Sequence, residues 1–182
     1  MRHLPNIICL FRIVLIWPII ESLLAGAYDR TLLLFFIAAA SDGLDGWLAK
    51  RYGWTSRLGK WLDPIADKLL LVSMFLVLTW LGLIPRYLAV GAVGRDVLIG
   101  LGAVVFRFAW GPLRGRPILS SKINTLLQLL YVLLVIAHAA WGQPPATVLQ
   151  ALAVMIVATV LYSGLSYLRE FTLRALQVAA RA

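Results

Sequence analysis

The chain has 182 residues, of which 62% are hydrophobic and only 14% are charged, and its mean hydropathy is +0.88. A soluble domain of this size needs more polar surface than this composition supplies, so the composition excludes a soluble globular protein. The net charge of +9 could indicate a nucleic-acid partner, but basic residues beside apolar segments are typical of proteins that lie in anionic membranes, and no nucleic acid is expected.

Apolar segments long enough to cross a bilayer follow one another along the chain. A span needs about 20 mostly apolar residues, and we expect six spans in a single membrane domain, residues 1–182. The predicted fold is therefore an all-α bundle of six transmembrane helices. In chain order the spans cover residues 5–25, 31–40 with a polar continuation from 41, 62–83, 87–108, 118–141 and 147–168, the last followed by a short basic tail.

The basic residues alternate between successive connections. The second and fourth connections and both chain ends hold most of them: Arg2, Arg12, Lys50, Arg51, Arg57, Lys60, Arg107, Arg114, Arg116, Lys122, Arg169, Arg174 and Arg181. The first and third connections hold only Arg30 and Arg86, and the fifth has none. Because basic connections stay on the cytoplasmic side, this pattern predicts that both termini are cytoplasmic. We expect a protein of the bacterial inner membrane.

Four of the eight acidic residues fall between positions 42 and 67. Asp42 and Asp45 are three residues apart, and Asp63 and Asp67 are four apart, so each pair shares one face of a helix. The segment KRYGWTSRLG between the pairs suits a helix-to-helix connection, which would bring the two pairs face to face near the cytoplasmic side. Converging carboxylates repel one another unless a cation lies between them, and their oxygens suit Mg²⁺, Mn²⁺ or Ca²⁺.

These aspartates could instead serve as helix caps or form surface ion pairs with the neighbouring lysines and arginines. Pro64 predicts that a helix either begins or bends there, and a helix beginning there would make Asp63 its N-cap. An acidic relay in a cation transporter and a non-catalytic scaffold are further alternatives. Ionisable groups within spans are usually functional, and a transporter would not require small residues at fixed distances from the acids.

The spacing Asp-x2-Asp-Gly-x2-Ala-Arg-x8-Gly-x3-Asp-x3-Asp is the signature of the CDP-alcohol phosphatidyltransferases, and this chain resembles it closely. Lys50 stands where the family has arginine, which keeps the charge but loses the two-pronged guanidinium fork. The other signature residues are all present at the correct spacing, namely Asp42, Asp45, Gly46, Ala49, Gly59, Asp63 and Asp67.

The resemblance implies transfer of a phosphatidyl group from CDP-diacylglycerol to an alcohol, with release of CMP. It implies that two divalent ions, Mg²⁺ or Mn²⁺, are bound by Asp42, Asp45, Asp63 and Asp67. It also implies that Asp67 is the general base that takes the proton of the alcohol. The residues that would accommodate the CDP moiety are Gly46, Ala49, Lys50 and Gly59.

Two further polar segments interrupt the fourth span and open the fifth. Arg95 and Lys122, together with Asn124, would form a pocket for a phosphate-bearing acceptor if they face the bundle interior. The alternative is an ion pair of Asp96 with Arg95 or Lys122. Neighbouring residues on a helix point in different directions, which disfavours an Arg95–Asp96 pair. Small residues in the same fourth span would permit close helix packing or a homodimer.

The opening segments Leu4-Pro5-Asn6 and Phe11-Arg12 resemble the glycerol-type branch of the family. That branch contains the phosphatidylglycerophosphate synthases and the CMP-forming cardiolipin synthases, which make anionic phospholipids. The segments Arg95-Asp96-Val97 and Ser121-Lys122-Ile123-Asn124-Thr125 are more similar to the cardiolipin synthases. The resemblance therefore favours phosphatidylglycerol as the acceptor, with glycerol-3-phosphate as the alternative.

Overall fold

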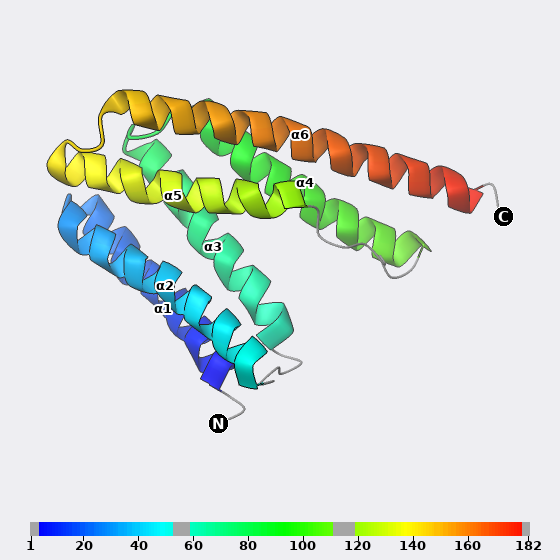
Figure 1. The fold of residues 1–182 in the computed structure, drawn as a ribbon, viewed down its shortest axis with the longest axis horizontal. Coiled ribbons are helices and arrows are strands. Elements are labelled where there is room, and N and C mark those ends of the chain that lie inside the picture. The colour runs from blue at the N-terminus through cyan, green and yellow to red at the C-terminus, as the bar shows by residue number, and fades with distance from the viewer. Residues whose placement is uncertain (1–3, 53–58, 111–118, 180–182) are drawn as a thin grey trace. The chain divides into compact units, whose positions relative to one another are not determined.

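The structure, a computed structural model, describes residues 4–52, 59–110 and 119–179, which form six α-helices (Figure 1). The structure also describes the side chains of these helices, except at residues 4–6, 42, 44–50, 52, 59–64, 103–110, 119–120, 168, 170–171 and 173–179. The all-α prediction is confirmed for this part of the chain. The helices are α1 Leu4–Leu24, α2 Tyr28–Tyr52, α3 Gly59–Trp80, α4 Arg86–Trp110, α5 Leu119–Trp141 and α6 Ala146–Ala179.

Several helix boundaries differ from the sequence prediction by three residues or more, and two of them bear on the expectations for Asp63 and for the basic tail. Helix α3 already begins at Gly59, so the expectation that Asp63 could be an N-cap is wrong, and Pro64 lies within the first turns instead. A proline at this position removes the backbone hydrogen bond that an N–H would donate to the carbonyl four residues earlier. Helix α6 runs for 34 residues without a break. The predicted basic tail is thus a continuation of the sixth helix.

Three helices in the described part of the chain are long and apolar enough to cross a membrane. Their apolar stretches are Ile7–Leu24, Ser121–Trp141 and Ala146–Tyr167. Helices α2, α3 and α4 interrupt their apolar sequence with charged residues, as in the segment SDGLDGWLAKR of α2. The six-span topology and the side on which the termini lie stay predictions.

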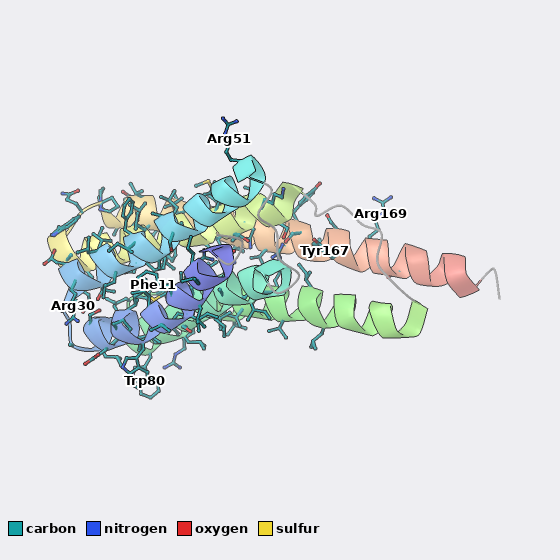
Figure 2. The ribbon with its side chains drawn as sticks, turned by 90° about the horizontal axis from the view of Figure 1, so that it is seen from below. Phe11, Arg30, Arg51, Trp80, Tyr167 and Arg169 are labelled. Carbon is teal, nitrogen blue, oxygen red and sulfur yellow. The ribbon has the colours of Figure 1, made fainter. Side chains whose placement is uncertain are left out.

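Large apolar side chains are exposed on the outer faces of the helices. Trp80 is 85% exposed, Trp17 is 78% exposed and Phe11 is 49% exposed. Figure 2 shows Trp80 projecting outward from the ribbon. Such surfaces are unfavourable in water and are expected where a helix faces lipid.

The chain divides into two compact units, and the first contains the acidic signature. Unit 1 consists of Met1–Ile84 and Leu129–Leu149. Within it, α1 packs against both α2 and α3. The C-terminal end of α2 and the N-terminal end of α3 lie at the same end of this unit (Figure 1). Its buried core includes Ile19, Leu23, Phe35, Met74, Phe75 and Leu78.

Unit 2 consists of Pro85–Gln128 and Gln150–Ala182. Its buried apolar residues lie on α4 and α6: Leu88, Ala89, Ala92, Leu152, Ala153 and Ile156. A Cβ added at Gly91 would lie 3.9 Å from the Val160 side chain, which is ordinary contact, whereas one added at Gly94 would meet nothing within 4 Å. The small residues of α4 thus leave open space at Gly94 and do not bring helices into close contact there.

Candidate active site

The backbone of unit 1 places the acidic signature on two helices that meet at one end. Asp42 and Asp45 lie in the C-terminal half of α2, and Asp63 and Asp67 lie near the start of α3. The side chains of Asp42, Asp45 and Asp63 lie outside the described residues, so the facing of the two acidic pairs stays a prediction. The same holds for the residues expected to accommodate CDP: Gly46, Ala49, Lys50 and Gly59.

Asp67 is the signature aspartate whose side chain is described, and it contacts an arginine from α1. Arg12 Nη1 donates a hydrogen bond to Asp67 Oδ1 over 2.6 Å, and the two charges form a salt bridge. Arg12 is 0% exposed, whereas the Asp67 side chain is 38% exposed. The charge-assisted bond fixes the direction of the carboxylate, while the exposure leaves Asp67 accessible to a ligand.

The packing of α1 against α3 explains this contact. Cys9, Leu15 and Ile19 of α1 and Ala66 and Leu70 of α3 are buried in the core of unit 1. Arg12 lies among these apolar residues, where an unpaired charge would be strongly unfavourable. Its pairing with Asp67 offsets that penalty and ties the two helices together.

Sequence reasoning did not identify Arg12 as a site residue. It noted Arg12 only as a positive charge near the amino end and as part of the resemblance to the glycerol-type branch. The available signal was an arginine inside an apolar span, because such a residue usually has a specific partner. Its partner could not be read from the sequence, since Asp67 is 55 residues away.

The chemistry of the donor set fits a hard divalent cation. All four aspartates offer carboxylate oxygens, which Mg²⁺ and Mn²⁺ prefer over nitrogen and sulfur. Among the described side chains, which do not include those of Asp42, Asp45 and Asp63, no group of three or more potential metal ligands occurs. Arg51 is exposed and points outward from the end of α2 (Figure 2).

A second buried arginine lies in unit 2. Arg95 Nη1 donates to Asp96 Oδ1 over 2.6 Å, and Arg95 Nε donates to Ser163 Oγ of α6 over 3.0 Å. The expectation that Arg95 and Asp96 would point apart is wrong. The long arginine side chain folds back beside its neighbour, and both side chains are buried, at 4% and 7% exposed.

Asn124 belongs to the same buried polar region of unit 2. Its Oδ1 accepts a hydrogen bond of 2.9 Å from Thr159 Oγ1, one helical turn before Ser163 on α6. Asn124 and Gln128, one turn apart on α5, are both buried. Lys122, by contrast, is exposed. Residues two positions apart point to opposite sides of a helix, so the structure does not bring Lys122 into the buried cluster with Arg95 and Asn124.

Three buried donor groups in unit 2 have no hydrogen-bond acceptor among the described residues. They are Arg95 Nη2, Asn124 Nδ2 and Gln128 Nε2. An unsatisfied buried donor costs about 1–3 kcal/mol. Each of the three groups is a donor, so each lacks a hydrogen-bond acceptor. An anion such as a phosphate supplies this.

The comparisons with known proteins agree with these features. The sequence model of the family described as CDP-alcohol phosphatidyltransferase matches residues 2–173. The probable cardiolipin synthase (CMP-forming) of Drosophila melanogaster is 32% identical over 180 residues, which cover 90% of this chain and 56% of that protein. The cardiolipin synthase (CMP-forming) of Rattus norvegicus is 28% identical over 180 residues, which cover 90% of this chain and 60% of that protein.

A bacterial relative named for a different activity matches over a similar region. The CDP-diacylglycerol–glycerol-3-phosphate 3-phosphatidyltransferase of Bacillus subtilis (strain 168) is 30% identical over 162 residues. This match covers 76% of the chain and 78% of the relative. The chain thus spans less than two thirds of the length of the two cardiolipin synthases but most of the length of the Bacillus protein.

Proposed function

Because the chain belongs to the CDP-alcohol phosphatidyltransferase family, we propose that it transfers a phosphatidyl group from CDP-diacylglycerol to a glycerol-type alcohol and releases CMP. The observation that carries this proposal is the position of Asp67. This carboxylate lies at the end of the acidic signature, is 38% exposed and is held by the buried Arg12. The product would be an anionic phospholipid.

The bond changes assign a role to Asp67. The hydroxyl oxygen of the acceptor forms a bond to the phosphorus that carries the diacylglycerol, and the hydroxyl proton passes to the Asp67 carboxylate. The bond between that phosphorus and the oxygen of CMP breaks, and CMP leaves with the electron pair. A base within hydrogen-bond reach of the hydroxyl contributes about 10²–10⁴-fold to such a step. Arg12 acts through Asp67, by fixing the direction of its carboxylate.

The four aspartates would hold divalent metal beside this base. Asp42, Asp45, Asp63 and Asp67 offer oxygen ligands from two helices that meet at one end of unit 1. When bound, Mg²⁺ or Mn²⁺ offsets the negative charge of the pyrophosphate and of the departing CMP. The residues that would lie against the CDP moiety are Gly46, Ala49, Lys50 and Gly59.

Phosphatidylglycerol is the acceptor that we favour. The segment Arg95-Asp96-Val97 and the relative in Drosophila melanogaster support this choice. The relative in Bacillus subtilis supports glycerol-3-phosphate as the second candidate. Both acceptors carry a primary hydroxyl on a glycerol that bears a phosphate. The buried donors of Arg95 and Asn124 suit that phosphate in either case.

We place the protein in the bacterial inner membrane with six spans and the acidic signature near the cytoplasmic face. The alternation of basic residues along the sequence supports this topology, and three of the helices are apolar and long enough to cross a membrane. Cysteine-accessibility labelling in intact cells tests it. Residues of the predicted second and fourth connections, such as Arg57 and Arg114, should be reached only after the membrane is permeabilised.

The activity is tested with the purified full chain in detergent. Protein with CDP-diacylglycerol and Mg²⁺ or Mn²⁺ should release CMP when an alcohol is added. Phosphatidylglycerol and glycerol-3-phosphate are supplied side by side, and mass spectrometry identifies the product. Absence of CMP with both alcohols, combined with cation flux in proteoliposomes, would replace the transferase by the transporter alternative.

A further inference from the structure

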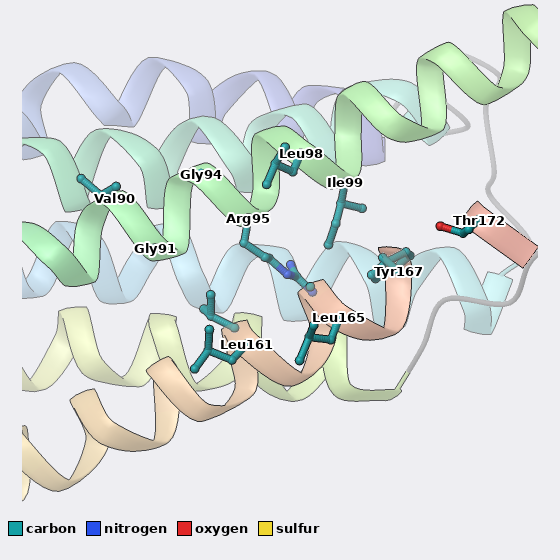
Figure 3. Close-up of a pocket in the computed structure, with 12 residues that line it drawn as sticks. Val90, Gly91, Gly94, Arg95, Leu98, Ile99, Leu161, Leu165, Tyr167 and Thr172 are labelled. Atoms are coloured by element: carbon teal, nitrogen blue, oxygen red, sulfur yellow. The ribbon is translucent and has the colours of Figure 1, made fainter. Parts of the chain in front are cut away.

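An apolar groove runs between α4 and α6 within unit 2. It has a volume of about 650 Å³, and its walls include Leu98 and Ile99 of α4 and Leu161 and Leu165 of α6. Figure 3 shows Arg95 extending from α4 toward α6, with Leu161 and Leu165 on the opposite side of the groove. Arg95 is the one arginine among the described residues of this apolar wall, and the groove therefore combines surfaces that suit an acyl chain and an anionic headgroup.

Arg95 is prepared to bind an anion at this groove. Its side chain is 4% exposed, and two of its nitrogens are engaged by Asp96 and Ser163. The third nitrogen, Nη2, is buried and has no acceptor among the described residues. A phosphodiester oxygen carries negative charge and only accepts hydrogen bonds, so it matches this donor.

Glycines keep the groove open on both of its helices. A Cβ added at Gly94 of α4 or at Gly164 of α6 would meet nothing within 4 Å, and both residues line the groove. Glycine is a poorer helix former than alanine, so each of these residues weakens its helix. Glycine at both positions preserves space that larger side chains would occupy.

We infer that the α4–α6 groove binds a glycerophospholipid, with an acyl chain along the apolar walls and the phosphodiester on Arg95, and that this lipid is the acceptor phosphatidylglycerol. The inference rests on the proposed transferase function and sharpens it. Glycerol-3-phosphate has no acyl chain and would leave the apolar walls unused. The residues expected to accommodate the CDP-lipid belong to α2 and α3, whereas the described residues that line the groove belong to α4 and α6.

Lipid binding is measured directly by native mass spectrometry of the delipidated full chain. Phosphatidylglycerol and diacylglycerol with identical acyl chains are titrated, and the protein should retain phosphatidylglycerol preferentially, because diacylglycerol lacks the phosphodiester that Arg95 would bind. Gly164→Leu and Gly94→Leu fill the groove from opposite sides and should each weaken this binding by about tenfold or more. Arg95→Leu should reduce phosphatidylglycerol binding to the level of diacylglycerol.

Gly100→Leu is the matched control. Gly100 also lies on α4, a Cβ added there meets nothing within 4 Å, and it does not line the groove. This variant should bind phosphatidylglycerol as the unmodified protein does. Equal retention of both lipids by the unmodified protein, or an equal loss in the Gly100→Leu control, would overturn the inference. Conversion of a dimer to monomers by Gly164→Leu would assign the groove to a second copy of the chain and would also overturn it.

Kinetics with the same variants separate this inference from the proposed function. In the unmodified protein, absence of CMP release with either alcohol refutes the transferase, whatever the lipid-binding result. If CMP is released, Gly164→Leu should raise KM for phosphatidylglycerol and leave KM for CDP-diacylglycerol unchanged. A rise in KM for CDP-diacylglycerol alone, or turnover with glycerol-3-phosphate only, would refute the groove assignment and leave the transferase standing.

Discussion

The two units each bury an arginine that forms a 2.6 Å bond to an aspartate, but the two pairs are built differently. Arg12 in unit 1 reaches a carboxylate 55 residues away on another helix, and that carboxylate is 38% exposed. Arg95 in unit 2 bonds its sequence neighbour Asp96, and that carboxylate is only 7% exposed. The accessible group is thus the carboxylate in the first pair.

This difference indicates opposite chemical roles for similar pairs. In unit 1 the arginine is fully enclosed and orients Asp67, which can reach a proton or a metal. In unit 2 the aspartate is enclosed and offsets the charge of Arg95, whose Nη2 still lacks an acceptor among the described residues. The first pair suits the reacting groups, and the second suits recognition of an anion.

Removal of divalent metal should produce the largest loss of activity. This loss should concern the site of the Arg12–Asp67 pair and not that of the Arg95–Asp96 pair. Chelation with EDTA is expected to reduce CMP release below detection, since four carboxylates would then face the pyrophosphate without a cation. Added Mg²⁺ or Mn²⁺ should restore turnover. Retention of phosphatidylglycerol in native mass spectra should be unaffected by chelation. Turnover that survives exhaustive chelation would contradict the metal assignment.

Matched aspartate substitutions should distinguish the two pairs by rate. Asp67→Asn removes the base and should lower kcat by about 10²–10⁴-fold. Asp96→Asn likewise leaves Arg95 with a hydrogen-bond acceptor. Because the proposed mechanism gives Asp96 no part in the reaction, this variant should lower kcat by less than about tenfold. Size-exclusion profiles of both variants should match the unmodified protein. Near-normal turnover of Asp67→Asn would remove Asp67 from the role of base.

Arg12→Leu should lower kcat by roughly 10–100-fold, because Asp67 loses the bond that orients it. Arg12→Lys keeps the positive charge but loses the two-pronged guanidinium. Its kcat should lie between those of Arg12→Leu and the unmodified enzyme. The double variant Arg12→Leu/Asp67→Asn tests whether Arg12 acts through Asp67. It should be no slower than Asp67→Asn alone, because residues that act as a unit are not additive. If kcat of the double variant lay below that of Asp67→Asn by the whole factor measured for Arg12→Leu, Arg12 would act independently on the substrate.

The helices were predictable because apolar runs of span length are a local property of the sequence. The ends of α1, α4 and α5 lie within about two residues of the ends of the predicted spans. The start of α3 was less predictable. Pro64 is compatible with either a helix start or a position in the first turns, and only the backbone path distinguishes them.

The acidic signature could also be recognised from spacing alone, but the contacts around it could not. The Arg12–Asp67 pair depends on how α1 packs on α3, and a single sequence carries no information on that long-range contact. The Arg95–Asp96 bond depends on side-chain rotamers, which helix geometry does not determine. Gln128, Thr159 and Ser163 were missed because a lone polar residue in an apolar helix does not indicate its partner.

The smallest effect is expected at Lys122, where sequence and structure lead to different expectations. Lys122 is exposed, whereas Asn124, two positions along α5, is buried with an unsatisfied amide nitrogen among the described residues. Lys122→Ala should therefore change KM for the acceptor by no more than about twofold, as is usual for an exposed position. Asn124→Ala should raise the same KM by about tenfold, because it removes a buried donor. If Lys122→Ala raised KM as much as Asn124→Ala, the lysine would reach the anion in the working enzyme, and recognition would depend on an exposed cation as well as on buried donors.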